Sequence, residues 1–174
     1  MSEATLGRQP AALALTRSAL ARLIALLLPF ALLGGAMGSQ YLGGLVPCEM
    51  CIWQRWPHGA AILLAALAFT APASSERSRT LTLLAALAIA VSGAIGVYHA
   101  GVELGIFEGL TTCASTAGGA TNAELLDQIM KTPLVRCDQV QFAFLGISMA
   151  GWNAILSLGG AAVITFLTLR DMRA

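Results

Sequence analysis

Four cysteines are the residues of this chain best suited to chemistry, and their spacing divides them into two kinds of pair. Two residues separate Cys48 from Cys51, so a disulfide between them closes a short ring and stabilises the fold little by loop closure. A CxxC pair of this kind commonly has one thiol of lowered pKa, which suits disulfide exchange better than stapling. Cys113 and Cys137 are separated by a longer segment. The two pairs are therefore placed for a relay between two exchangeable disulfides.

Other uses of four cysteines remain open at this point. A structural zinc site usually takes its thiolates from two close-spaced pairs, and Cys113 and Cys137 lack that form. Two inert structural disulfides are a second alternative. Four cysteines also permit three disulfide connectivities. We expect redox chemistry and no resident metal ion.

Three cationic or ionisable side chains lie where they can assist the thiols. Arg55 follows Cys51 by one helical turn if the helix has already begun, although Pro57 could move the helix start to a point after Cys51. An arginine at the edge of a bilayer indicates a functional site, because a charge is costly there. The Arg55 cation would stabilise a Cys51 thiolate or a reduced quinone oxygen. A lipid-facing role for Arg55, reaching phosphate headgroups, is the alternative. His99, with Glu103 four residues on, is a candidate to bind a quinone or carry a proton, and His58 is a weaker one.

The elements that must position these residues follow from composition. Of 174 residues 57% are hydrophobic and 11% are charged, whereas a soluble domain carries about 25% charged residues. This apolar excess cannot fit inside one small core, so part of it must face lipid. The net charge of +1 offers no surplus to neutralise a run of phosphates, which argues against nucleic-acid binding.

Four apolar stretches predict four membrane helices, because each approaches the roughly 20 residues that cross a hydrocarbon core. No stretch shows the period of two that barrel strands require. The fold class predicted is all-α, an integral membrane four-helix bundle forming a single domain over residues 1–174. The spans are expected at about 23–45, 56–71, 81–100 and 142–169, with outer loops at about 46–55 and 101–141.

The distribution of basic residues predicts the orientation, since cytoplasmic loops accumulate Lys and Arg. Four spans place both termini and the loop between the second and third spans on one side. That side holds Arg8, Arg17, Arg22, Arg77, Arg79, Arg170 and Arg173, whereas the other holds Arg55, Lys131 and Arg136. We therefore expect a multi-pass protein of a bacterial inner membrane with cytoplasmic termini and all four cysteines on the oxidising, periplasmic side.

The second outer loop contains a further predicted element. Leu125, Leu126, Ile129 and Met130 share one face of a helix over residues 124–131. This pattern is typical of a short amphipathic helix on a membrane surface. It would hold the segment with Cys137 near the bilayer.

At these residues the sequence resembles the bacterial disulfide bond formation protein B (DsbB) family of inner-membrane thiol oxidases, over roughly residues 23–170. The most specific part is Pro47-Cys48-Glu49-Met50-Cys51 with Arg55 four residues further on and Gln40 eight residues before Cys48. The second cysteine pair and the order of four spans add to it. The Thr- and Gly-rich second loop and the segment Tyr98–Glu103 depart from the best-known members.

The resemblance implies a path for electrons. A reduced thioredoxin-fold partner of the DsbA type attacks a Cys113–Cys137 disulfide at Cys113. Cys137 then exchanges with the first pair through Cys48, and Cys51, beside Arg55, passes the electrons to a membrane quinone, ubiquinone or menaquinone. The activity implied is that of a protein dithiol:quinone oxidoreductase.

Two other functions remain as alternatives. A vitamin K epoxide reductase-like enzyme also uses a CxxC beside a quinone in a four-helix bundle, but there the CxxC lies late in the chain, whereas here it comes first. A non-catalytic membrane assembly or metal-handling protein is the second alternative. It predicts activity that survives Cys51→Ser and stoichiometric metal in the purified protein.

Overall fold

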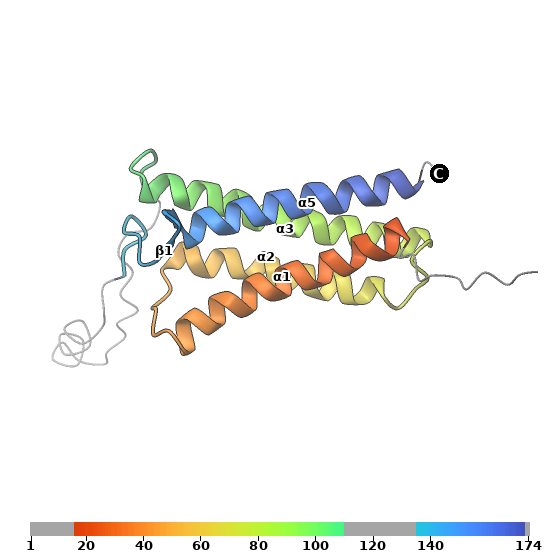
Figure 1. Cartoon of the computed structure of the whole chain (residues 1–174), viewed down its shortest axis with the longest axis horizontal. Coiled ribbons are helices and arrows are strands. Elements are labelled where there is room, and N and C mark those ends of the chain that lie inside the picture. The colour runs from red at the N-terminus through yellow and green to blue at the C-terminus, as the bar shows by residue number, and fades with distance from the viewer. Residues whose placement is uncertain (1–15, 110–134, 173–174) are drawn as a thin grey trace, which may run out of the picture.

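The computed structural model describes residues 16–109 and 135–172, which form four long helices and one short hairpin. The helices lie side by side along one bundle (Figure 1), in which α3 packs against α2 and α5, and α1 packs against the same two helices. Their bounds are α1 Arg17–Tyr41, α2 Glu49–Ala68, α3 Glu76–Glu103 and α5 Met149–Met172. The helical bundle predicted from the sequence is confirmed for the described residues, while Cys113 and the helix predicted at 124–131 lie outside them.

Three of the helices, α1, α3 and α5, are long and apolar enough to cross a membrane. The N-terminal half of α2 carries the polar residues Glu49, Gln54, Arg55 and His58, which lower its hydropathy. The second predicted span, 56–71, covers the part of α2 that follows Arg55 and the three residues after the helix ends at Ala68. Its passage through a membrane therefore stays a prediction, although α2 runs alongside the other helices (Figure 1).

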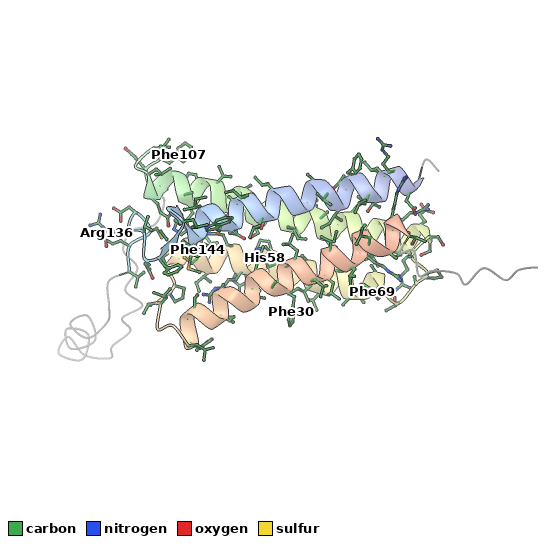
Figure 2. The ribbon with its side chains drawn as sticks, in the orientation of Figure 1. Phe30, His58, Phe69, Phe107, Arg136 and Phe144 are labelled. Atoms are coloured by element: carbon green, nitrogen blue, oxygen red, sulfur yellow. The ribbon has the colours of Figure 1, made fainter. Side chains whose placement is uncertain are left out.

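The bundle has small side chains inside and large ones outside. Its main core consists chiefly of alanines, among them Ala25, Ala61 and Ala85, with Ile89 and Ile164. Large apolar side chains such as Phe30, which is 64% exposed, face outward (Figure 2). Membrane helices pack in this way, because small residues allow close approach and lipid solvates the outer face.

Glycines allow close approach at some helix contacts and not at others. A Cβ on Gly96 of α3 would lie 3.0 Å from the carbonyl oxygen of Ala150 and 3.1 Å from the amide nitrogen of Ala154, both on α5. By contrast, no other described part of the chain comes within 4 Å of a Cβ built on Gly34 or Gly38 of α1. The GxxxG spacing of that pair is therefore not a helix-packing motif within this bundle.

The helix bounds differ from the predicted spans at their ends. Thr16 caps α1, which begins six residues earlier than predicted and ends at Tyr41 rather than at residue 45. Ser75 caps α3, which extends the third span at both ends. Hydropathy detects the apolar centre of each helix, whereas polar first turns and caps lie beyond it.

The fourth predicted span was wrong at its start. Residues 142–148 precede α5 and contain β1 Ala143–Phe144 and β2 Ile147–Ser148, which pair antiparallel. Leu145 and Gly146 turn the hairpin with φ angles of 53° and 78°, a left-handed conformation that no helix contains. The hairpin lies at the end of the bundle where α2 begins (Figure 1).

The opposite end of the bundle holds the connection between α2 and α3 and the last turns of α5 (Figure 1). Arg22 donates to the carbonyl oxygen of Ala71 at 3.1 Å and stacks over the ring of Phe69. Arg79 pairs with Asp171 across α3 and α5 at 3.6 Å. Arginines of α1 and α3 thus lie at the end predicted to be cytoplasmic.

Candidate active site

The CxxC motif forms the start of α2. Cys48 is the N-cap residue, and its sulfur accepts a hydrogen bond from the backbone N–H of Cys51 at 3.3 Å. The two sulfur atoms lie 2.9 Å apart, Cys48 being buried and Cys51 half-buried. The sequence left open whether the helix begins before or after Cys51. It begins at Glu49, with Pro57 inside it, so Cys51 lies in the first turn, where unpaired backbone N–H groups favour an anionic sulfur.

Cys137 lies next to this motif although 86 positions separate it from Cys51 in the sequence (137 − 51). It is 8% exposed and belongs to the same buried cluster as Cys48, Met50 and Val102, against which Cys51 packs. Its thiol is close enough to Cys48 for the two to interact electrostatically. The fold therefore brings three of the four predicted site cysteines together.

Charged residues flank Cys137 on both sides in the chain. Arg136 donates to Asp138 through Nε at 2.8 Å and again through Nη2, and the pair is well exposed. These hydrogen bonds hold the pKa of Asp138 below its usual value. Figure 2 shows Arg136 at the same end of the molecule as Phe144 of the hairpin.

Arg55 lies one turn after Cys51 and connects α2 to α1. Its guanidinium donates to the carbonyl oxygen of Ala36 at 3.2 Å and to Oε1 of Gln40. These contacts do not support the alternative in which Arg55 reaches away from the protein to headgroups. They also account for Gln40, which the sequence singled out only by its spacing.

His99 lies within hydrogen-bonding distance of the CxxC motif. Its Nε2 is 3.5 Å from the sulfur of Cys48 and 3.8 Å from Oε1 of Glu103. Gln54 donates through Nε2 to the carbonyl oxygen of Met50, and this bond fixes the orientation of the amide. The same amide nitrogen lies 2.9 Å from Nδ1 of His99 and, because it can only donate, Nδ1 is the acceptor. The hydrogen of the neutral His99 ring is therefore on Nε2, facing the cysteine.

A buried polar network behind the motif joins α2, α3 and α5. The amide nitrogen of Asn153 donates to Oε1 of Gln54 at 2.8 Å, and its Oδ1 lies 2.9 Å from Nε2 of His58. Ser92 bonds both His58 and the backbone of Gln54. Asn153 thereby connects α5 to α2. Gln54 and Ser92 were missed, although Gln54 and His58 are four residues apart on the buried face of α2.

Gln54, His58 and Asn153 of this network line a cavity of about 620 Å³. It opens between α1, the start of α2, and the hairpin, where the ring of Trp152 donates to the carbonyl oxygen of Phe144 at 3.0 Å. Most of the lining is apolar, and its polar members are few. Those polar or redox-active members include Cys48, Cys51, Arg55, His58, His99 and Glu103. A mostly apolar cavity with few convergent polar groups is typical of a site for a flat organic molecule.

The thiols differ in how readily they ionise. The hydrogen bond from Cys48 to Cys51, together with burial, raises the pKa of the Cys48 thiol above its usual value. Cys48 therefore holds its proton in the reduced state. Cys51, in the first turn of α2 with Arg55 one turn further on, is the better placed of the two to be the thiolate.

Three of these residues could also bind a metal ion. One donor atom from each of Cys48, Cys51 and His99 lies within 4.8 Å of the others. Two thiolates and an imidazole suit zinc or another soft cation, but only while the cysteines are reduced. A disulfide between Cys48 and Cys51 would remove two of the three donors.

Comparisons with known proteins agree on one family. The family model described as "Disulfide bond formation protein DsbB" matches residues 18–167. Disulfide bond formation protein B of Hahella chejuensis is 31% identical over 150 residues, covering 82% of this chain and 88% of the relative. Disulfide bond formation protein B 1 of Pseudomonas putida is 28% identical over 158 residues, covering 84% and 88%. An uncharacterised protein of Rickettsia prowazekii is 24% identical over 123 residues, covering 69% and 70%. No solved structure gives a significant match.

Proposed function

The chain belongs to the DsbB family of disulfide bond formation proteins, and we propose that it works as a membrane thiol oxidase that links a dithiol partner to quinone. Membership of the family makes it an oxidoreductase of disulfide bond formation. The partner proposed is a periplasmic, thioredoxin-fold protein of the DsbA type. The electrons would leave through the membrane quinone pool, with the cysteines facing the periplasm of a bacterial inner membrane.

The observation that carries this proposal is the position of Cys137 beside Cys48. A thiolate must contact a disulfide sulfur to exchange with it. The Cys137 thiolate would attack the sulfur of Cys48 in the Cys48–Cys51 disulfide. A Cys48–Cys137 bond forms, the Cys48–Cys51 bond breaks, and the electron pair leaves on Cys51.

The surroundings of Cys51 favour it as the leaving group. A thiol leaves faster when its thiolate is more stable. Cys51 lies in the first turn of α2, at the positive end of the helix dipole, and the Arg55 cation lies one turn away. His99, with its Nε2 hydrogen facing Cys48, is placed to hydrogen-bond the sulfur that is attacked.

The cavity fits the head group of a quinone. Arg55 lines it with a buried Nε–H that has no partner in the described part of the chain, so this donor is free to bond a quinone oxygen. His99 lines the same cavity beside Cys48. When bound, a quinone supplies an acceptor for two electrons and two protons. The protein would contribute the position of Cys51, the Arg55 donor and an apolar lining that excludes water.

The first steps of the relay, from the dithiol partner to Cys137, are inferred from the family alone. Cys113 would form the second disulfide with Cys137, and the reduced partner would attack it at Cys113. That attack releases Cys137 as the thiolate that exchanges with Cys48. The second loop, 101–141 in the sequence, would thus carry electrons from the partner to the membrane.

A cross-linking experiment tests the exchange step. Cys51→Ser with Cys113→Ser leaves Cys48 and Cys137, and mild oxidation with diamide should give a Cys48–Cys137 disulfide within one chain, detected by peptide mass spectrometry. The matched control, Cys48→Ser with Cys113→Ser, leaves Cys51 and Cys137 and should cross-link more slowly. Equal rates in the two variants, or no cross-link in the first, would overturn the proposed route.

A further inference from the structure

His58 lines the cavity and has a buried ring nitrogen without a partner in the described part of the chain. Four buried side-chain atoms in the described part of the chain lack a hydrogen bond: Nε of Arg22, Arg55 and Arg79, and Nδ1 of His58. Of these residues, only Arg55 and His58 line the cavity. His58 is 3% exposed and lies inside the bundle (Figure 2). An unpaired buried polar atom costs about 1–3 kcal/mol, so these two atoms point to a ligand.

Whether His58 offers a donor or an acceptor follows from the network around it. The amide nitrogen of Asn153 lies 3.2 Å from the backbone carbonyl oxygen of Ser92, which can only accept. This bond fixes the amide orientation, so Asn153 turns its oxygen toward Nε2 of His58 at 2.9 Å. An amide oxygen only accepts, and Nε2 therefore carries the hydrogen.

Ser92 leads independently to the same tautomer. Its hydroxyl donates to the backbone carbonyl oxygen of Gln54 at 2.9 Å. That bond uses the only hydrogen of the hydroxyl, so Ser92 must accept from Nε2 of His58, also at 2.9 Å. With Nε2 protonated, Nδ1 of the neutral ring is an acceptor.

We propose that Nδ1 of His58 accepts a hydrogen bond from the hydroxyl of a reduced quinone, so that the cavity binds quinol more tightly than quinone. This inference rests on the proposed function and deepens it. A quinone has only acceptor oxygens, which would face the lone pair of Nδ1, whereas a quinol donates through its hydroxyls. Arg55 donates to an oxygen of either form, whereas the acceptor at Nδ1 of His58 favours the quinol.

Preference for the reduced form makes the bound quinone a stronger oxidant. The overall reaction balances: a dithiol gives two electrons and two protons to the quinone, leaving a disulfide and a quinol. Tighter binding of the product side favours this direction by mass action. A tenfold preference corresponds to about 30 mV for a two-electron couple.

Nuclear magnetic resonance of ¹⁵N-labelled histidine gives a direct test, because the chain has two histidines. The probes are ubiquinone-1 and ubiquinol-1, added to the Cys48→Ser/Cys51→Ser protein, which binds them without turnover. His58→Leu identifies which signals belong to His58. The Nδ1 signal of His58 should lie in the unprotonated range and move upfield with ubiquinol-1 more than with ubiquinone-1. A protonated Nδ1, or equal responses to the two probes, would overturn the inference.

Affinity measurements in the same protein separate this inference from the proposed function. Quenching of tryptophan fluorescence, with Trp152 in the cavity lining, reports binding of each probe. We expect His58→Leu to reduce the preference for ubiquinol-1 about fivefold to tenfold, the value of one hydrogen bond. Ser157→Ala removes another bond to Oδ1 of Asn153 outside the cavity and should leave the preference unchanged.

The outcomes distinguish the two claims. Equal affinity for both probes in the parent protein, or a preference that survives His58→Leu, would refute the role of His58 while the quinone cavity stands. Binding of neither probe would refute the cavity itself. If His58→Leu fails to fold, as judged by circular dichroism, His99→Leu leaves His58 as the one histidine and assigns its signals, whose position and response in the parent protein then decide the role of His58.

Discussion

At the start of α2, two thiols of one motif have different surroundings. Cys48 is 4% exposed and hydrogen-bonds Cys51, which raises the pKa of Cys48. Cys51 is half-buried and lines the cavity. Because the thiolate is the nucleophile, this difference assigns different steps to the two sulfurs. Cys48 would receive the attack of Cys137, and Cys51 would face the quinone.

The raised pKa of Cys48 predicts an order of alkylation in the reduced protein. A raised pKa keeps the thiol protonated at pH values where an ordinary cysteine is already ionised. Iodoacetamide should therefore modify Cys51 before Cys48, and modification of Cys48 should become appreciable only toward high pH. Peptide mass spectrometry over a pH series from about 6 to 9 measures both rates. Faster labelling of Cys48 than of Cys51 at neutral pH would contradict the assignment.

Much of the chemistry at this scale could be predicted from residue types and spacing. The sequence indicated the CxxC motif, Arg55 and His99, since thiols and charged groups near a membrane boundary are few. It missed Gln54 and Ser92, because their importance comes from contacts with residues distant in the chain. A signal was present, since Gln54 and His58, like Asn153 and Ser157, are polar pairs four residues apart in helices. Only packing shows that the two pairs face each other.

Between elements, the contact of α3 with α5 fixes the position of the polar network. Gly96 lies against the backbone of α5 at Ala150 and Ala154, next to the amide of Asn153. A larger side chain there would push α5 away and disturb the bonds from Asn153 to His58 and Gln54. Helix packing and site geometry therefore depend on the same contact.

Gly96→Leu should destabilise the protein by about 1–3 kcal/mol, the usual cost of overpacking. For a chain of this size the midpoint of thermal unfolding should fall by about 5 °C. Gly34→Leu is the matched control, because a Cβ on Gly34 meets nothing within 4 Å. Circular dichroism in detergent measures both midpoints. A similar midpoint for both variants would show that α3 and α5 can separate without cost.

Element boundaries were predicted less well than element number. Hydropathy located the apolar centres of the helices, yet it extended the last one through a hairpin. The apolar residues at the start of that predicted span do not belong to a helix. Two of them, Phe142 and Phe144, line the cavity, and Leu145 lies in the hairpin turn. Two-residue strands are too short to show a period of two. The polar half of α2 had the opposite effect and shortened the predicted second span.

For the whole molecule, the two ends of the bundle differ in charge and chemistry. One end holds the cysteine cluster, the cavity and the hairpin. The other holds the pair of Arg79 with Asp171 and the contact of Arg22 with Ala71. The positive-inside rule predicts that the second end lies in the cytoplasm.

Single cysteines in a cysteine-free chain test this orientation. Glu108→Cys follows α3 near the site, and Ser74→Cys lies in the connection between α2 and α3, both at exposed positions. A membrane-impermeant maleimide added to cells with a permeabilised outer membrane should label Glu108→Cys, and should label Ser74→Cys only after lysis. The reverse pattern would place the cysteine cluster in the reducing cytoplasm and rule out the proposed partner.

The proposed function requires that electrons pass from a dithiol partner through Cys51 to quinone. The most direct measurement follows quinone absorbance with purified protein in detergent, ubiquinone-1 or a menaquinone analogue, and a reduced DsbA-type partner. We predict that the wild-type protein consumes quinone in proportion to the partner disulfide formed, and that Cys51→Ser abolishes consumption. Two results would contradict this electron path. One is a wild-type protein that consumes no quinone with either acceptor, and the other is a Cys51→Ser protein that retains activity.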